Sequence, residues 1–288
     1  MPEVVQDNSN RESPVVRVID MVKRFGAQAV LDGVSLDVLP GETMVVMGPS
    51  GCGKSTLLRH MIGSIWPDEG RVELFGRNLG EMDESELDQV RKRFGILFQS
   101  GALFNSMTIG ENVALPLREH TNLDSDTIDI IVRIKLELVG LREALDRMPA
   151  EISGGMKKRA GLARAIALDP EILFYDEPSA GLDPVTSAEI DQLIMDLSHK
   201  LGVTSVVVTH EMDSAFRIAD RMAMLDRGQI LKVALRKEFE DIRDGQAGRG
   251  PSDDLIRQFL RGESDGPITA RRLSSGYAED ILNVGRGR

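Results

Sequence analysis

The sequence predicts an α/β fold with a mainly parallel sheet, because short apolar runs alternate with amphipathic segments along most of the chain. The runs at residues 44–47, 172–175 and 204–209 are apolar enough to be strands that are covered on both faces. A glycine-rich turn follows the first run and leads into a helical segment, as in phosphate-binding loops. This order of strand, turn and helix predicts an anion site at the carboxyl edge of the sheet.

The N-terminal part of the chain is expected to contain a β-hairpin. Residues 1–13 are polar and are expected to form a mobile tail. Residues 15–19 and 34–38 alternate as paired strands do, and Phe25 and Gly26 lie between them. An exposed Phe25 could stack on a purine base, although a core position is the more ordinary interpretation of a phenylalanine.

The glycine-rich turn reads GPSGCGKST and matches the phosphate-binding pattern at Gly48, Gly53, Lys54 and Ser55. Successive backbone N–H groups in such a turn converge on phosphate, and Gly51 and Gly53 remove Cβ atoms that would keep the backbone away. Lys54 can reach the outer phosphates, and the Ser55 hydroxyl can bind Mg²⁺. A chance glycine-rich turn is the alternative, which the flanking strand and helix disfavour. The predicted phosphate site also includes Pro49, Ser50, Cys52 and Thr56.

The middle of the chain continues the alternation and includes a strand that ends at Gln99. Residues 100–122 contain glycine, asparagine and proline, so we expect them to be irregular and exposed. Residues 124–140 carry apolar side chains at helical spacing, and Gly140 is expected to end that helix. The remaining predictions here are a helix at residues 55–63, strands at 71–75 and 95–98, and a charged helix at 83–92.

The second half of the chain predicts further helices and one hairpin. The long amphipathic segment at residues 185–201 is a helix that Gly202 ends. We further expect a helix from 153 to 168, a hairpin of 222–225 with 229–233, a linker at 241–252, a helix at 253–261 and a polar tail at 262–288.

Four residues that could take part in chemistry or binding lie at the ends of predicted strands, namely Gly48, Gln99, Asp176 and His210. Because ligands of parallel sheets lie beyond the carboxyl ends of the strands, we expect these residues to line one site. Asp176 and Glu177 suit Mg²⁺ binding and polarisation of an attacking water, although two solvated acids are the alternative. Gln99 could place the water or touch the metal. His210 could hydrogen-bond a γ-phosphate, whereas a histidine at a strand end is otherwise a structural residue.

A second anion site is predicted at Ser153, Gly154 and Gly155, where a hydroxyl and exposed backbone N–H groups begin a helix. One chain does not readily wrap both anion sites around a single nucleotide. We therefore expect a head-to-tail dimer, in which each chain presents Ser153 to the nucleotide that Lys54 of the other chain holds.

Composition limits the classes of function. The 288 residues carry a net charge of −11, which argues against sequence-independent nucleic-acid binding. No apolar run approaches the roughly 20 residues of a membrane-spanning helix, and no signal peptide is recognised. Cys52 is the single cysteine, which excludes an intrachain disulfide and fits a reducing cytoplasm.

The motifs GPSGCGKST, ISGGM, ILFYDEPSAGLDP and VVVTHE, in that order, resemble the nucleotide-binding subunits of ATP-binding cassette (ABC) transporters. The ISGGM signature before the acidic strand separates these subunits from other phosphate-loop ATPases. The resemblance implies a P-loop NTPase (RecA-like) core, an N-terminal antiparallel β subdomain and an α-helical signature subdomain at about residues 100–165. It implies an ATPase domain at residues 14–240, followed by the linker, short helix and tail of residues 241–288.

The resemblance also implies roles for the residues that match its motifs. Phe25 would stack on adenine, and residues 48–56 would bind the ATP phosphates and Mg²⁺. Gln99 would be the Q-loop residue, Asp176 the magnesium aspartate, Glu177 the catalytic base, Asp183 a D-loop residue at the dimer interface, and His210 the switch histidine.

A narrower resemblance, carried by LFQSGALFNSMTIGENVALPLREHT and RQFLRGESDGPI, is to MlaF-type subunits. These subunits energise lipid trafficking across the Gram-negative envelope from the cytoplasmic face of the inner membrane. The implied partners are a second copy, an MlaE-type permease, usually an MlaD-type Mce-domain protein, and an MlaB-type STAS regulator that is known for such systems. Met156 replaces the common glutamine of the signature, as in this lipid branch, whereas residues 181–184 read GLDP where the branch often has GQDP.

Residues 102–108 are expected to shape the groove that receives the permease's cytoplasmic helix. The alternatives are an ABC ATPase for another solute, or a non-transport ABC ATPase that acts on DNA or ribosomes. The acidic charge and the single cassette disfavour the latter.

Overall fold

The computed structural model describes residues 13–247 and 250–272. The tail predicted at residues 1–13 lies outside the described residues except for its last residue, and so do residues 273–288 of the predicted C-terminal tail. Within the described residues, no helix has the length and apolar character that crossing a membrane requires.

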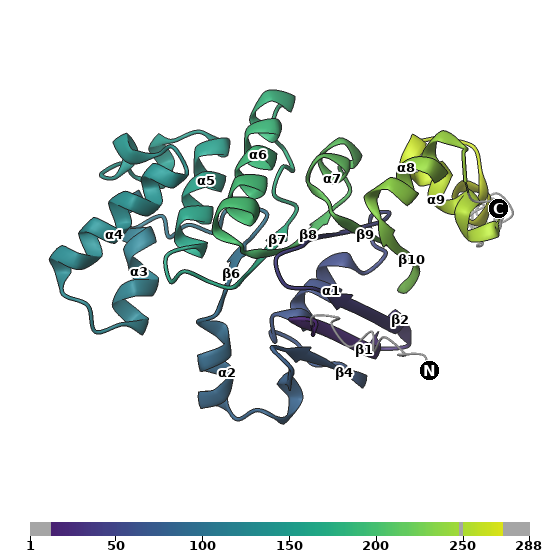
Figure 1. Cartoon of the computed structure of the whole chain (residues 1–288), viewed down its shortest axis with the longest axis horizontal. Coiled ribbons are helices and arrows are strands. Elements are labelled where there is room, and N and C mark those ends of the chain that lie inside the picture. Colours follow the sequence, from purple (N-terminus) through teal and green to yellow (C-terminus); the bar gives the residue numbers. More distant parts are fainter. Residues whose placement is uncertain (1–12, 248–249, 273–288) are drawn as a thin grey trace, which may run out of the picture.

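The larger of two sheets contains the strands that the apolar runs predict (Figure 1). They are β3 (Thr43–Met47), β6 (Phe94–Leu97), β7 (Ile172–Asp176), β8 (Thr204–Thr209), β9 (Arg221–Asp226) and β10 (Gln229–Leu235). Their order in space is β10-β9-β3-β8-β7-β6. The pairs from β9 to β6 are parallel, whereas β10 pairs antiparallel with β9 at one edge. The prediction of a mainly parallel sheet is confirmed, and so is the C-terminal hairpin.

The smaller sheet is antiparallel and has the order β2-β1-β4-β5. Its strands are β1 (Val16–Phe25), β2 (Gln28–Val38), β4 (Glu69–Leu74) and β5 (Arg77–Asn78). The predicted N-terminal hairpin is confirmed, with Val16 opposite Val38. It is longer than predicted, so that Phe25 is the last residue of β1 before the turn.

Helices cover both faces of the larger sheet. Figure 1 shows α3 to α6 gathered at one end of the molecule, and α8 and α9 at the other end. The helices are α1 (Lys54–Met61), α2 (Glu84–Arg91), α3 (Ile109–His120), α4 (Ser125–Leu138), α5 (Gly154–Ala165), α6 (Pro184–Leu201), α7 (Met212–Ile218), α8 (Arg236–Asp244), α9 (Pro251–Arg261) and α10 (Pro267–Arg272). Short 3₁₀ turns lie at Leu79–Glu81, Arg142–Ala144 and Pro149–Glu151.

The central strands have buried side chains on both faces because each face packs against a different layer. In β3, Met44 and Val46 belong to the core that the antiparallel sheet and α1 complete. Val45 and Met47 belong to the core that α3 to α7 complete. Side chains alternate between the faces of a strand, so a strand between two layers buries the side chains of both faces. The two layers hold the carboxyl ends of the parallel strands in place.

The expectation that residues 100–122 are irregular and exposed is wrong for α3. Thr108 and Glu111 form a capping box at its start, each side chain bonding the other residue's backbone N–H. Ile109, Val113 and Leu117 follow at helical spacing and are buried. Pro116 lies inside this helix. The burial of one apolar face and the capping box together outweigh the proline.

The linker predicted at residues 241–252 is also partly wrong. Helix α8 continues to Asp244 and ends at Gly245, which adopts a left-handed conformation with φ of 77°. Phe239 and Ile242, one turn apart, bury the inner face of α8. Helix α9 then begins at Pro251, two residues before the predicted start.

Candidate active site

The phosphate loop connects β3 to α1 beside the end of β9. Gly48 has a φ of 154°, and a Cβ atom there would lie 2.0 Å from the Leu225 carbonyl oxygen. Gly53 precedes α1 with a φ of 111°, and its Cβ would lie 2.9 Å from the Val30 oxygen. Gly51 has a φ of 79° but open space around it, so glycine is favoured there by the backbone conformation and not by close packing against a neighbour. The tight packing holds the loop against the sheet edge.

Helix α1 begins with Lys54 and Ser55, directly after this loop. The Lys54 Nζ is 2.7 Å from the Gly48 carbonyl oxygen and 3.1 Å from that of Pro49. The Ser55 hydroxyl donates to Asp176 Oδ1 at 3.1 Å. This bond joins the first turn of α1 to the end of β7, 121 residues later. The fold therefore brings the predicted phosphate and metal residues together.

The other loop residues differ in accessibility. Ser50 is exposed, whereas Pro49 and Thr56 are half-buried. Cys52 is only 5% exposed, and burial raises the pKa of its thiol.

Glu177 lies directly after β7, and both its carboxylate and its backbone N–H form hydrogen bonds. Its carboxylate Oε1 is 2.9 Å from His210 Nδ1, and Oε2 accepts from the His210 backbone N–H at 3.3 Å. The backbone N–H of Glu177 donates to the Val208 carbonyl at 2.9 Å. Glu177 has a φ of 51°, which is uncommon for a residue with a Cβ atom. The predicted base and the predicted switch histidine are in direct contact.

Lys158 is a residue of this site that the sequence reasoning missed. It lies in the second turn of α5, is 5% exposed, and donates from Nζ to the Glu177 carbonyl oxygen at 3.0 Å. Burial lowers the pKa of its ammonium, and the carboxylates of Glu177 and Asp176 oppose that shift. Lys158 lies at helical spacing from Gly155 and Leu162, which are buried, and this spacing is the pattern in the sequence that indicates its burial.

The predicted second anion site and the D-loop lie side by side, at the first turns of α5 and α6. Ser153 caps α5, with its hydroxyl accepting from the Met156 N–H at 3.2 Å. Asp183 caps α6, accepting from the N–H groups of Val185 at 3.0 Å and Thr186 at 3.1 Å. These bonds, led by that from the Thr186 hydroxyl, lower the Asp183 pKa.

Glycine is required where these two helix starts meet. A Cβ on Gly155 would lie 2.4 Å from Thr186 Cγ2. Ser153 and Gly154 are exposed, so the two helix starts face solvent. The signature site therefore remains open to a molecule outside the chain.

Gln99 and Phe25 are both exposed. Gln99 follows β6 by two residues, at the same edge of the sheet as Asp176. Phe25 is 54% exposed at the end of β1, and the Lys23 ammonium lies 5.6 Å from the centroid of its ring. The core position considered for Phe25 is excluded.

The donor set at Ser55 and Asp176 fits Mg²⁺. It offers a hydroxyl and a carboxylate oxygen 3.1 Å apart. In the described part of the chain, no cluster of three or more histidine, cysteine or acidic side chains could hold a metal. Mg²⁺ normally takes one or two protein oxygens together with phosphate and water. The site therefore suits an ion that arrives with a nucleotide.

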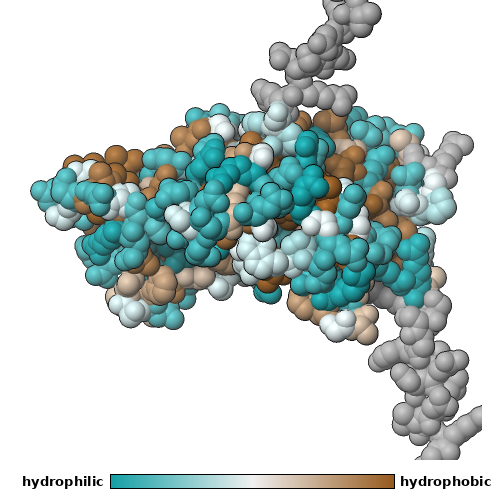
Figure 2. Space-filling view, turned by 90° about the horizontal axis from the view of Figure 1, so that it is seen from below, coloured by the Kyte–Doolittle hydropathy of each residue, from teal (hydrophilic) through white to brown (hydrophobic). Residues whose placement is uncertain are grey.

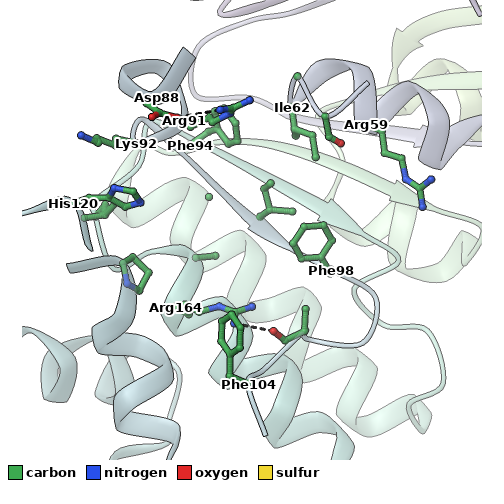
Figure 3. A pocket seen from close by; sticks show the side chains of 18 residues that line it. Arg59, Ile62, Asp88, Arg91, Lys92, Phe94, Phe98, Phe104, His120 and Arg164 are labelled. Carbon is green, nitrogen blue, oxygen red and sulfur yellow. Dashed lines mark hydrogen bonds and ion pairs between the residues drawn. The ribbon is translucent and has the colours of Figure 1, made fainter. Parts of the chain in front are cut away.

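A cavity of about 700 Å³ lies between α1, α2, β6, α3 and α5, and we call it the lateral groove. Figure 3 shows Arg91 and Lys92 at one end of the lateral groove and Phe104 beside Arg164 at the other. The Arg164 guanidinium donates to the carbonyls of Gly101 at 3.0 Å and Ala102 at 2.8 Å. The charged and ionisable lining residues are Arg59, Asp88, Arg91, Lys92, His120 and Arg164, an excess of positive charge in an acidic chain.

Apolar side chains are exposed outside the groove as well. Figure 2 shows several brown patches on a largely hydrophilic face, including some toward the end that carries α4. On α4 itself, Ile130, Ile134 and Leu138 recur every fourth residue and are exposed. They form an apolar stripe along the outer side of that helix.

A family model and individual protein sequences both match this chain. Residues 31–180 match the family model described as ABC transporter. The intermembrane phospholipid transport system ATP-binding protein MlaF of Escherichia coli K12 is 43% identical over 274 residues, which cover 94% of this chain and 98% of that protein. The probable ribonucleotide transport ATP-binding protein mkl of Mycobacterium leprae is 42% identical over 253 residues, covering 88% of this chain and 70% of that protein.

The fold also matches solved ATP-binding cassettes. A dimeric structure of the cassette MJ0796, in a post-hydrolysis state bound to ADP and Pi, superimposes with a TM-score of 0.71 at 30% identity. The match covers 77% of this chain and 98% of that one.

Proposed function

The chain belongs to the ABC transporter family, and we propose that it is the ATP-hydrolysing subunit of a system that moves phospholipid between the membranes of a Gram-negative envelope. The observation that carries the proposal is the 43% identity to an MlaF protein over 94% of the chain. The site agrees with it, because the phosphate loop, Asp176, Glu177 and His210 meet at one edge of the sheet.

ATP would bind with its phosphates in the loop of residues 48–56 and its adenine on Phe25. The Lys54 ammonium would exchange two loop carbonyls for phosphate oxygens. The exposed Phe25 ring offers a stacking face, because aromatic rings stack on any base. Ser55 and Asp176 would hold Mg²⁺, with Gln99 as a further ligand, and the ion would neutralise charge on the phosphates.

Glu177 would act as the general base in hydrolysis. Its carboxylate would take a proton from the water whose oxygen attacks the γ-phosphorus, and the products would be ADP and phosphate. His210 holds this carboxylate through its Nδ1 and its backbone N–H. We assign His210 the role of sensing the γ-phosphate, because its side chain is half-exposed beside the base.

A second copy would complete each site. Ser153, Gly154 and Gly155 would contact the nucleotide that the other chain holds, and Asp183 would lie at the same interface. The open N-terminus of α5 supports this arrangement, and so does the similarity to a cassette whose structure is dimeric. The ATP-bound dimer would then contain two composite sites.

The lateral groove would receive a cytoplasmic helix of an MlaE-type permease. The segment at residues 102–108 forms part of its wall, and Phe98 and Phe104 supply exposed aromatic contacts. The positive lining favours a helix that carries acidic groups. Such docking would hold the protein at the cytoplasmic face of the inner membrane, in systems that also contain an MlaD-type protein and an MlaB-type regulator.

The first test separates catalysis from nucleotide binding. Glu177→Gln should reduce ATP turnover by at least about 100-fold and leave ATP affinity within about twofold, because only the proton acceptor is lost. Lys54→Ala should instead weaken ATP binding. Glu84→Gln, the same chemical change on exposed α2, is the control and should turn over normally. Full turnover by Glu177→Gln would exclude the proposed base.

The second test addresses the transported solute. The protein should co-purify with a membrane permease and, in reconstituted vesicles, drive ATP-dependent movement of a fluorescent phospholipid. ATP-dependent movement of ribonucleotide instead would favour the second candidate function, which the mkl relative suggests. Co-purification with ribosomes or DNA would exclude both.

A further inference from the structure

Lys158 is a charged side chain in a position that normally holds an apolar one. It is 5% exposed and shares a face of α5 with the buried residues Gly155 and Leu162. Burying an ammonium is unfavourable unless hydrogen bonds and opposite charges compensate for it. Its described hydrogen bond is to the Glu177 carbonyl oxygen, at 3.0 Å.

The backbone of Glu177 is in a conformation that needs such support. A φ of 51° places it in the left-handed region, which disfavours residues with a Cβ atom. Its carbonyl accepts from Lys158 and, at 3.3 Å, from the Ala180 N–H, while its own N–H donates to Val208 at 2.9 Å. The orientation of this peptide unit determines the direction in which the Glu177 side chain leaves the backbone. Left-handed non-glycine residues persist where the surroundings determine the backbone, and they cluster at functional sites.

We propose that Lys158 is a positioning residue for ATP hydrolysis, and that its ammonium holds the Glu177 peptide so that the carboxylate points to the attacking water. Lys158 acts through the carbonyl of Glu177 and not through the nucleotide. The inference rests on the proposed role of Glu177 as the general base.

The position of Lys158 on α5 adds a consequence for the dimer. Ser153 caps this helix, and Lys158 follows five residues later, about 7.5 Å along the axis at 1.5 Å per residue. A nucleotide of the partner subunit that binds the start of α5 therefore acts on the same rigid element that holds Glu177. Lys158 would then link occupancy of one composite site to hydrolysis in the other.

The experiment compares Lys158→Met, Lys158→Arg and the control Lys157→Met in the full-length chain. Lys157 is the neighbouring lysine on the same helix, and its side chain is half-buried. Steady-state ATPase rates would give kcat, KM and the Hill coefficient for ATP, and fluorescent-nucleotide titration would give the affinity. Because a misplaced catalytic group loses up to about 100-fold in rate, Lys158→Met should lower kcat roughly 10- to 100-fold.

The remaining expected results distinguish positioning from a general structural role. ATP affinity of Lys158→Met should stay within about twofold of the unmodified protein, and its Hill coefficient should fall toward 1. Lys158→Arg retains the charged donor and should recover most of kcat, while Lys157→Met should match the unmodified protein. Equal losses of affinity and kcat in Lys158→Met would overturn the proposal, and so would an unchanged kcat.

One further variant keeps the test decisive if Lys158→Met does not fold. Lys158→Gln removes the charge and shortens the donor, so its kcat should lie well below that of Lys158→Arg at the same KM. Equal kcat values for these two variants would overturn the proposal. If Glu177→Gln is inactive while Lys158→Met turns over fully, only the inference about Lys158 fails. If Glu177→Gln turns over fully, the proposed base fails, and this inference fails with it.

Discussion

Replacing Asn112 by alanine is expected to loosen the wall of the lateral groove. Asn112 lies on α3 and is fully buried, with 0% exposure. Its Oδ1 accepts from the Phe104 N–H at 2.8 Å. Its Nδ2 donates to the carbonyls of Phe104 at 3.1 Å, Met107 at 3.2 Å and Thr108 at 2.9 Å. One side chain thus replaces the backbone partners that the irregular segment lacks.

The expected loss of folding stability follows from the loss of these hydrogen bonds. The two N–H groups of Nδ2 are shared among three carbonyls, so the side chain makes at most three full hydrogen bonds, which contribute about 3 kcal/mol at roughly 1 kcal/mol each. Phe104 is 50% exposed as a residue, so water can reach part of the freed backbone and reduce the loss. We expect Asn112→Ala to lower the free energy of unfolding by about 2–3 kcal/mol, with a further effect on docking because Phe104 is no longer held.

Urea unfolding and permease-stimulated ATPase activity are the assays. Asn122→Ala is the matched control, because Asn122 is exposed and should change stability by less than about 0.5 kcal/mol. Asn112→Asp should destabilise more than Asn112→Ala, since it places a carboxylate among carbonyl oxygens. Basal ATP hydrolysis should persist in Asn112→Ala while stimulation by the permease falls. A stability loss below about 0.5 kcal/mol together with normal stimulation would refute the reasoning.

Three further predictions concern single side chains. Phe25→Ala should weaken ATP binding about tenfold, because base stacking contributes about 1–3 kcal/mol. Binding of tripolyphosphate, which has no base, should not change when it is measured by calorimetry. Equal losses of affinity for both ligands would contradict stacking. Burial raises the pKa of the Cys52 thiol, so maleimide labelling should be slow at neutral pH, accelerate as pH rises and be blocked by ATP. The labelled protein should not bind ATP, and normal binding would contradict the steric argument. Burial lowers the pKa of His60, so the unfolded chain binds the proton more tightly than the folded chain does. The contribution of neutral His60 to the free energy of unfolding should therefore be complete above about pH 6.5 and should be lost as pH falls, which urea unfolding at a series of pH values would measure. A His60→Gln variant whose stability falls in acid just as that of the unmodified protein does would contradict this.

Much of the fold could be predicted because its signals are local. An apolar run such as residues 172–175 predicts a strand covered on both faces wherever it occurs. The left-handed glycine at 202 ends α6 through its own backbone conformation. The phosphate loop is recognisable for the same reason, since strand, glycine turn and lysine are consecutive in the chain.

The failures have a physical reason that is equally specific. Pro116 favoured an irregular segment, yet the capping box of α3 and its buried face outweigh one proline. The glycine and charge content of residues 241–252 predicts a linker, yet α8 continues to Asp244 and buries Ile242 in its last turn. In both places, burial against a neighbouring layer outweighs local composition.

The residues that are chemically able to bind a triphosphate can be identified from the chain alone, because that ability depends on a contiguous loop and on acidic residues after apolar strands. Their partners become known only in the folded protein: Ser55 pairs with Asp176, His210 with Glu177, and Lys158 with the Glu177 carbonyl. Those pairs are 121, 33 and 19 residues apart. Contacts of that kind depend on which strands lie next to each other and which helix packs over them, and no local pattern contains that information.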